Sequence, residues 1–300
     1  MEARPGWWIR GPHLQTMWAR LARSRHLVKF EREVLTTPDD DDLVLDHSLD
    51  HTAGPEGAPR VLLLHGTEGS AYSLHTQGLA QLVVRAGWRA TVLNFRSCAR
   101  DPENIRRRLR NRRPRLYHSA DTSDLELVVR TLRAREPAVP LLAIGFSLGG
   151  GVLLKWLGQH GDAGGREASG IDAAVTISVP YQLAEAAAFL ERPGARFYVY
   201  NFMRRIKPKA LDVLARFPNE TAHVDAERVR RARTIREFDD ALTGPLHGFQ
   251  NAEDYYARAD TLPDLARIRT PTLSFSALDD PFIREKRWPA RKPSPRPPSS

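Results

Sequence analysis

The segment Gly145-Phe146-Ser147-Leu148-Gly149 constrains the fold of this chain more than any other. It follows an apolar run at 139–144 and precedes a helix-like stretch at 150–157, so the local order is strand, sharp turn, helix. Small residues around the serine let such a turn adopt strained backbone angles and expose the hydroxyl above a parallel sheet. The segment therefore predicts a nucleophilic serine, Ser147, at the end of a buried strand.

Short apolar runs before and after this turn predict further strands of the same sheet. They lie at 61–64, 87–95, 171–180 and 270–277, and helical patterns lie between them at 79–85 and 123–136. Strands that alternate with helices favour an α/β fold, with a mostly parallel sheet covered by helices on both faces. Residues 181–256 are helical in pattern and rich in aromatics, which predicts an insertion that covers the serine as a lid.

Length and composition fit one large domain. The chain has 300 residues, of which 41% are hydrophobic, enough to bury a full core. We expect the domain to span 1–283, because residues 284–300 change abruptly to Arg, Lys, Pro and Ser. That basic tail is expected to be disordered, and it supplies +5 of the formal net charge of +9.

The basic residues of the body do not favour a nucleic-acid partner. A block of arginines runs from Arg106 to Arg115 and is more typical of a solvated face, with attraction of anionic substrate or lipid headgroups as the alternative. No known nucleic-acid-binding motif accompanies it, so we expect no nucleic-acid partner.

Other features of the sequence favour a soluble, cytoplasmic protein. The single cysteine, Cys98, excludes an intramolecular disulfide, fits a reducing compartment and is expected to be a buried thiol. No apolar run approaches the roughly 18 residues of a membrane span, and the N-terminus lacks the pattern of a signal peptide. Residues 7–21 have helical spacing and are expected to pack on the domain, with peripheral membrane contact as the alternative.

The predicted chemistry is acyl transfer through Ser147. A serine hydroxyl needs a base to take its proton, and attack on an acyl carbon creates an oxyanion that backbone N–H groups must stabilise. The expected donors are the N–H of Leu148, directly after the nucleophile, and an N–H in the loop after the strand that ends at His65, most plausibly that of Thr67. This chemistry needs no cofactor, and no metal-ligand spacing is present.

An acid is easier to find in the sequence than a base. Asp280 follows the late strand at 270–277, where an acid would orient a histidine, and Asp279 is the alternative. His65 precedes the serine and is expected to be structural or to shape the oxyanion loop. His118 and His247 are the next candidates, although each is more typical of a surface or core histidine. No histidine follows His247.

Several motifs, in this order along the chain, resemble the YheT-type branch of the α/β-hydrolases, the AB hydrolase 4 family. They are His13-Leu14-Gln15-Thr16, His65-Gly66-Thr67-Glu68-Gly69-Ser70, Asn94-Phe95-Arg96, Tyr117-His118-Ser119-Ala120-Asp121, Gly145-Phe146-Ser147-Leu148-Gly149-Gly150, Phe238-Asp239-Asp240 and Asp279-Asp280-Pro281-Phe282. The resemblance covers about residues 5–283. It implies a carboxylic-ester hydrolase for small-molecule or lipid esters, with Ser147 as the nucleophile, Asp280 as the acid and a histidine beyond the last strand.

The sequence departs from that family after residue 283. Residues 284–292 offer neither a strand nor a histidine. We therefore expect the final strand, the histidine loop and the last helix to be missing, through truncation or a lost reading frame. The alternative function is a catalytically inactive protein of hydrolase fold.

Overall fold

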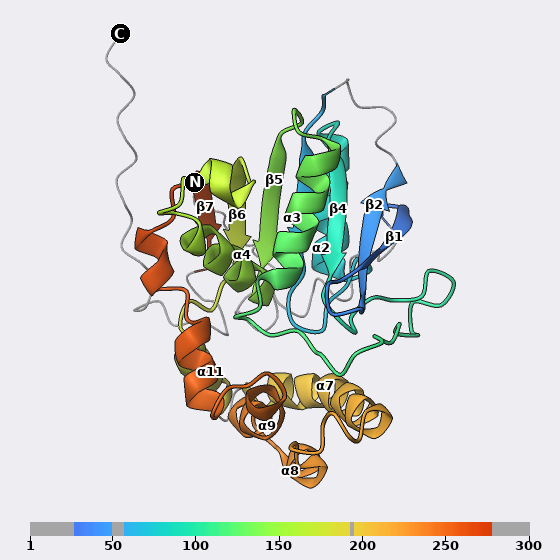
Figure 1. Ribbon diagram of the computed structural model, residues 1–300, viewed down its shortest axis with the longest axis vertical. Coiled ribbons are helices and arrows are strands. Elements are labelled where there is room, and N and C mark those ends of the chain that lie inside the picture. Colours follow the sequence, from blue (N-terminus) through green and yellow to red (C-terminus); the bar gives the residue numbers. More distant parts are fainter. Residues whose placement is uncertain (1–26, 50–56, 193–194, 278–300) are drawn as a thin grey trace, which may run out of the picture.

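A seven-stranded sheet forms the centre of the molecule (Figure 1). The computed structural model describes residues 27–49, 57–192 and 195–277. The strands lie side by side in the order β1-β2-β4-β3-β5-β6-β7. Their bounds are β1 (Phe30–Thr36), β2 (Asp42–Ser48), β3 (Arg60–Leu64), β4 (Arg89–Asn94), β5 (Leu141–Phe146), β6 (Ala173–Ile177) and β7 (Thr272–Phe275).

The sheet is mostly parallel, as the alternation of strands and helices predicts. Strands β4, β3, β5, β6 and β7 run parallel to one another, and in register Leu62 lies opposite Thr91 on one side and Ala143 on the other. The antiparallel strands β1 and β2, which the sequence did not predict, extend the sheet beyond β4. In β3 the four residues from Val61 to Leu64 are all buried, because helices cover both faces of a central parallel strand.

Helices on the two faces bury separate apolar cores. Helix α2 (Leu74–Arg85) packs on one face, where Ala80 and Val83 join side chains of β3 and β4. Helices α3 (Ser123–Arg135) and α4 (Leu148–Gln159) cover the other face, where Leu125 and Leu153 join the main core. A short helix, α5 (Arg166–Ser169), precedes β6.

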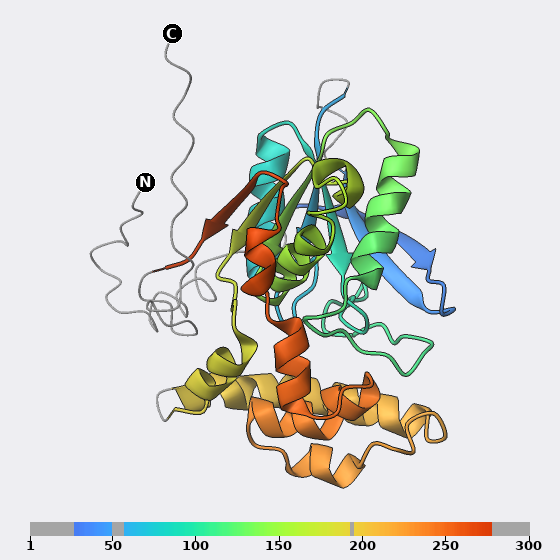
Figure 2. The same cartoon turned by 60° about the vertical axis from the view of Figure 1, so that its left-hand side comes forward.

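Helices gather in a separate layer at the carboxyl end of the parallel strands, where the arrowheads point (Figures 1 and 2). All of them lie between β6 and β7, and we call this layer, residues 183–259, the helical insertion. Its elements are α6 (Leu183–Leu190), α7 (Arg196–Arg216), α8 (Ala226–Arg231), α9 (Ile235–Phe238), the π-helix η3 (Asp239–Thr243), α10 (Gly244–Leu246) and α11 (Ala252–Ala259). The insertion has a core of its own, which includes Val213, Val229 and Leu242. A 3-10 turn, η4 (Pro263–Ala266), leads back to β7.

The described part of the chain contains no helix that is both long and apolar enough to cross a bilayer. The helix expected at 7–21 and the tail expected at 284–300 lie outside the described residues. Within them, β7 is the outer strand of the sheet, and its side chains Leu273 and Phe275 are exposed.

Candidate active site

Ser147 occupies the sharp turn between β5 and α4 that the sequence predicts. Its φ of 53° and ψ of −119° form a combination that side-chain-bearing residues rarely adopt. The backbone N–H of Ser147 donates to the carbonyl of Ile177 at 2.8 Å, which ties the turn to the end of β6. The serine therefore lies at the carboxyl edge of the sheet, on the side that faces the helical insertion (Figure 1).

Close backbone contacts explain why glycines surround the serine. A Cβ at Gly145 would lie 2.5 Å from the Cα of Gly150, and a Cβ at Gly149 would lie 2.5 Å from the carbonyl oxygen of Leu64. Both neighbours are main chain, which cannot turn away as a side chain can. The strained turn therefore needs these glycines for steric reasons, independently of any chemistry at Ser147.

The loop after β3 approaches Ser147 directly. A Cβ at Gly66 would lie 3.3 Å from the Cβ of Ser147, so the main chain of this loop runs beside the serine. In the loop, the N–H of Glu68 donates to the Tyr117 hydroxyl at 2.8 Å and that of Gly69 donates to the Gly66 carbonyl at 2.9 Å.

Two backbone N–H groups near Ser147 have no acceptor among the residues that the structure describes. Within the described residues, neither the Thr67 N–H nor the Leu148 N–H donates a hydrogen bond. Leu148 begins α4, where the first N–H groups of a helix have no partner in the preceding turn. They are the same two N–H groups that the sequence analysis names as candidate oxyanion donors, and this assignment stays a prediction.

His65 has the hydrogen bonds of a structural residue. Its Nδ1 lies 2.8 Å from the carbonyl oxygen of Gly66, and its Nε2 accepts the N–H of Phe95 at 3.1 Å. Burial lowers the pKa of this imidazole to about 4. Main-chain groups of two loops thus occupy both nitrogens, so His65 fixes the loop after β3 and is not free to act as a base.

His118 and His247 form a pair at the junction of the core and the insertion. Their ring centroids lie 4.5 Å apart, and Phe249 and Tyr255 pack edge-on against His118. Burial lowers the pKa of His118 to about 4; burial and the neighbouring His118 lower that of His247 to about 3. Over the described ranges, no imidazole forms a hydrogen bond with the hydroxyl of Ser147.

The acid expected from the sequence follows strand β7. Asp280 and its alternative Asp279 lie outside the described residues. Strand β7 ends at Phe275, and its neighbour β6 lies beside β5. The described ranges also hold no group of three or more His, Cys, Asp or Glu side chains able to bind a metal ion.

A buried polar cluster lies under the loop after β3, and sequence patterns gave no sign of it. Glu68 forms ion pairs with Lys209 of α7 and with Arg108, and the Tyr117 hydroxyl donates to Oε1 of Glu68 at 3.0 Å. Burial alone would raise the pKa of Glu68, but the two cations hold it at about 2. The Nζ of Lys209 also lies 3.7 Å from Sγ of Cys98.

Cys98 is a buried thiol, as the sequence predicts. Burial raises its pKa to about 11, so the thiol stays protonated at neutral pH. Glu68, an acid in a loop of otherwise small residues, was the one hint in the sequence, because its partner Lys209 is 141 residues away.

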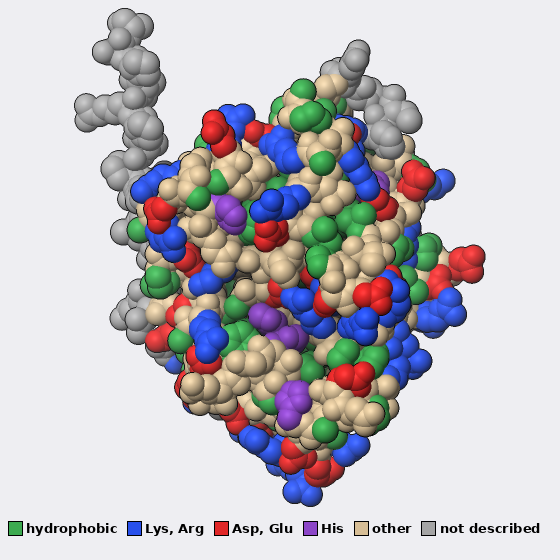
Figure 3. All heavy atoms as spheres, in the orientation of Figure 1, with side chains coloured by type: hydrophobic (Ala, Val, Ile, Leu, Met, Phe, Trp, Pro, Cys, Tyr) green, Lys and Arg blue, Asp and Glu red, His purple; other side chains and the backbone are tan. Residues whose placement is uncertain are grey.

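Several arginines of the block between Arg106 and Arg115 form ion pairs with aspartates. Arg112 and Arg113 pair with Asp40, and Arg115 pairs with Asp39 and Asp121. Blue and red side chains accordingly lie next to one another in the space-filling view (Figure 3). Much of the positive charge in this block is therefore compensated by nearby carboxylates, mainly those of the loop between β1 and β2.

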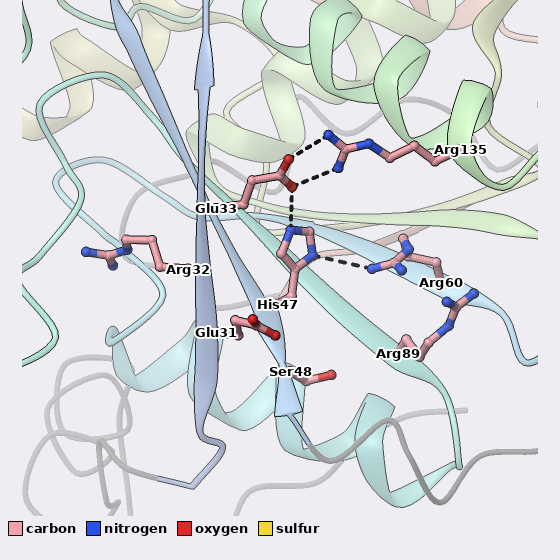
Figure 4. A pocket seen from close by; sticks show the side chains of 8 residues that line it. All are labelled: Glu31, Arg32, Glu33, His47, Ser48, Arg60, Arg89 and Arg135. Atoms are coloured by element: carbon pink, nitrogen blue, oxygen red, sulfur yellow. Dashed lines mark hydrogen bonds and ion pairs between the residues drawn. The ribbon is translucent and has the colours of Figure 1, made fainter.

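A pocket of about 340 Å³ opens beside strands β1 and β2, and Figure 4 shows its lining. It is lined by Glu31, Arg32, Glu33, His47, Ser48, Arg60, Arg89 and Arg135. Arg60 and Arg89 begin β3 and β4, so the pocket lies at the amino ends of strands whose carboxyl ends face the insertion. Glu33 pairs with Arg135, and Glu136 pairs with Arg60. Because carboxylates neutralise these arginines, we place the candidate site at the opposite edge, around Ser147.

Comparison with known proteins agrees with this architecture. A family model described as "alpha/beta hydrolase fold" matches residues 59–290. The chain is 35% identical over 288 residues to YheT of Escherichia coli (strain K12), named as an esterase, an alignment that covers 95% of this chain and 79% of that protein.

Two eukaryotic relatives carry more specific names. Monoacylglycerol lipase of Saccharomyces cerevisiae is 29% identical over 76% of this chain, and human phospholipase ABHD3 is 30% identical over 89%. The chain spans about half of the yeast protein (49%) and 63% of the human one.

Among solved structures, the esterase Pf2001 of Pyrococcus furiosus aligns with a TM-score of 0.47 at 17% identity, over 86% of this chain and 85% of that chain. The parallel sheet, the serine turn and the matches to the family model and to YheT establish that the chain belongs to the α/β-hydrolases, in the YheT-like esterase family.

Proposed function

We propose that this chain is a carboxylic-ester hydrolase that acts through an acyl-enzyme at Ser147. The observation that carries the proposal is the geometry of Ser147. A residue held at φ 53° at the end of a parallel strand, beside the loop after β3, has the placement of a nucleophile. Strain of this kind costs about 1–3 kcal/mol and persists where the surroundings enforce it.

In the proposed reaction the Ser147 hydroxyl attacks the acyl carbon of an ester. The hydroxyl proton passes to a base, a C–O bond forms, and the carbonyl oxygen becomes an oxyanion. The N–H groups of Leu148 and Thr67 would stabilise that oxyanion, and each donor of this type is worth about 3 kcal/mol in the transition state. Collapse expels the alcohol, which takes the proton, and water then releases the acid from Ser147. We assign Asp280 as the acid that would orient the base.

The proposed substrates are acyl esters of small molecules or lipids. The names of the yeast and human relatives, monoacylglycerol lipase and phospholipase, support a lipid ester. The helical insertion lies over the carboxyl edge of the sheet, and we propose that it acts as the lid of the site (Figure 2).

The competing proposal is a hydrolase fold without turnover. It is supported by the absence of any histidine after His247 in these 300 residues. It is also supported by the hydrogen bonds of His65, which leave neither nitrogen free. Loss of one member of a catalytic triad leaves only a small residual rate.

Hydrolysis of p-nitrophenyl esters of short and medium chain length tests the first proposal against the second. Turnover by the chain well above that of Ser147→Ala supports an active esterase. A fluorophosphonate probe that labels the chain but not Ser147→Ala would identify the nucleophile. Turnover equal to that of Ser147→Ala would reject the first proposal for these 300 residues and support the second.

A further inference from the structure

The segment that leads into and forms the first part of helix α7 differs in charge from the rest of the insertion. Residues 192–211 contain six basic residues and no acidic one. They are Arg192, Arg196, Arg204, Arg205, Lys207 and Lys209. Lys209 points inward to Glu68, whereas Arg196 and Arg204 are exposed. Within the described residues, neither of these two arginines forms an ion pair, in contrast to the compensated arginines of residues 112–115.

Two aromatic side chains project from the same face. Phe197 is 55% exposed and Tyr200 is 60% exposed, which places both among the large apolar side chains that the fold leaves in solvent. They are three residues apart, so they lie on one side of the helix, and Arg204 follows four residues after Tyr200. The guanidinium carbon of Arg204 lies 5.8 Å from the ring centroid of Tyr200. We call Arg196, Phe197, Tyr200 and Arg204 the α7 outer face.

The opposite side of the same helix shows that this exposure is not a packing defect. Val199, Met203 and Val213 are buried in the core of the insertion. The helix therefore packs its apolar side in the core of the insertion, and its second side, aromatic and basic, stays exposed. Exposed aromatic residues among unpaired cations indicate a binding surface rather than a solvated one.

A bilayer with anionic headgroups matches this surface best. Aromatic rings are favoured at the level of the headgroups, and each Lys or Arg near an anionic membrane contributes about 1 kcal/mol. A helix that lies in the interface inserts its apolar side chains and keeps its cations at the phosphates.

We propose that the α7 outer face docks the protein onto anionic phospholipid bilayers, with Phe197 and Tyr200 entering the interface and Arg196 and Arg204 binding lipid phosphates. This surface lies on the helix whose Lys209 contacts the loop beside Ser147. The proposal does not depend on catalysis, because membrane binding is measured without turnover.

The test is co-sedimentation of the full chain with sucrose-loaded vesicles. One set contains phosphatidylcholine alone, and the other contains equal molar parts of phosphatidylcholine and phosphatidylglycerol. We expect binding to the mixed vesicles, weaker at high salt, and little binding to phosphatidylcholine. Phe197→Ser with Tyr200→Ser, and separately Arg196→Gln with Arg204→Gln, should each reduce the partition coefficient about tenfold or more.

Matched controls come from helix α2, on the sheet. Leu82→Ser removes an apolar side chain that is 64% exposed, and Arg85→Gln removes an exposed cation. Both controls should bind as the unmodified chain does. Circular dichroism and thermal unfolding of every variant establish that the folds are unchanged.

Three outcomes would overturn the proposal. The first is no binding to mixed vesicles, and the second is binding that survives both α7 double variants, which would assign it to another part of the chain. The third is binding lost with the arginine variants alone, together with equal binding to single-stranded nucleic acid, which would indicate a general polyanion surface.

Discussion

The ammonium of Lys209 on α7 and the carboxylate of Glu68 in the loop after β3 form a buried ion pair that joins the helical insertion to the edge of the sheet. The side chains are 7% and 1% exposed. Tyr117 completes the contact, because its hydroxyl binds Glu68 and the Lys209 ammonium lies 4.5 Å from the centroid of its ring. One contact thus holds both the insertion and the main-chain loop beside Ser147.

Replacing Lys209 by methionine should destabilise the protein by about 3 kcal/mol, because it leaves a buried carboxylate without its nearest cation. Urea unfolding of the full chain measures the change. The double variant Glu68→Gln with Lys209→Met should be more stable than Lys209→Met alone, since the buried negative charge is then removed. Measurement of Glu68→Gln alone completes the comparison. A double-variant effect equal to the sum of the two single-variant effects would mean that the pair is not coupled.

The glycine at 149 should be far less tolerant of a methyl group than the glycine at 151. A Cβ at Gly149 meets the carbonyl oxygens of Leu64 and His65 at 2.5 and 2.6 Å, whereas one at Gly151 meets no atom within 4 Å. We expect Gly149→Ala to lower the free energy of unfolding by more than about 2 kcal/mol. The control Gly151→Ala should be neutral or stabilise α4 by up to about 1 kcal/mol. Similar thermal midpoints for the two variants would contradict the steric account of the turn.

Backbone strain at Ser147 can be measured without any enzymatic activity. Since φ is 53° at this position, Ser147→Gly should be more stable than Ser147→Ala by about 1–2 kcal/mol. At Ser274, within strand β7, the order should reverse, so that Ser274→Ala is more stable than Ser274→Gly. Denaturant unfolding of the four variants gives both differences. A Ser147→Ala variant at least as stable as Ser147→Gly would show that the turn is relaxed in solution.

The His118 and His247 pair should make the junction of core and insertion sensitive to acid. Both pKa values are lower in the fold, at about 4 and about 3, than the usual 6.5, because burial disfavours the charged imidazole. As the pH falls, these two histidines therefore bind protons in the unfolded chain at a higher pH than in the folded protein. The free energy of unfolding is unaffected by these histidines above about pH 6.5. It falls as the pH drops toward 4, by up to about 3 kcal/mol for His118.

Thermal unfolding between pH 7 and pH 4 tests this dependence. His118→Gln should lose stability less steeply with falling pH than the unmodified chain, although it is less stable at pH 7. His223, which is exposed, supplies the control variant His223→Gln, with an unchanged slope. Identical slopes in all three proteins would assign the acid sensitivity to other groups.

The parallel part of the fold was predictable from sequence because its signals are local. Buried runs such as Val61–Leu64 must be strands that helices cover on both faces, and the small residues around Ser147 permit a turn that other residues would block. Strand β1, in contrast, contains only half-buried and exposed residues, and its antiparallel pairing with β2 gave no comparable signal.

The sequence by itself determined the order strand, turn, helix around Ser147 and named Ser147, Leu148 and Thr67 as candidate site residues. Only the tertiary structure decided which histidines bond to the backbone or pack against one another. It also decided which lysines and arginines form ion pairs with carboxylates. Lys209 and Glu68 lie 141 residues apart, and the arginines at 112, 113 and 115 pair with Asp39 and Asp40 in the loop before β2. Such pairings depend on where distant segments pack, and electrostatic partners follow no sequence period, whereas buried strands and steric turns follow rules that act over a few neighbouring residues.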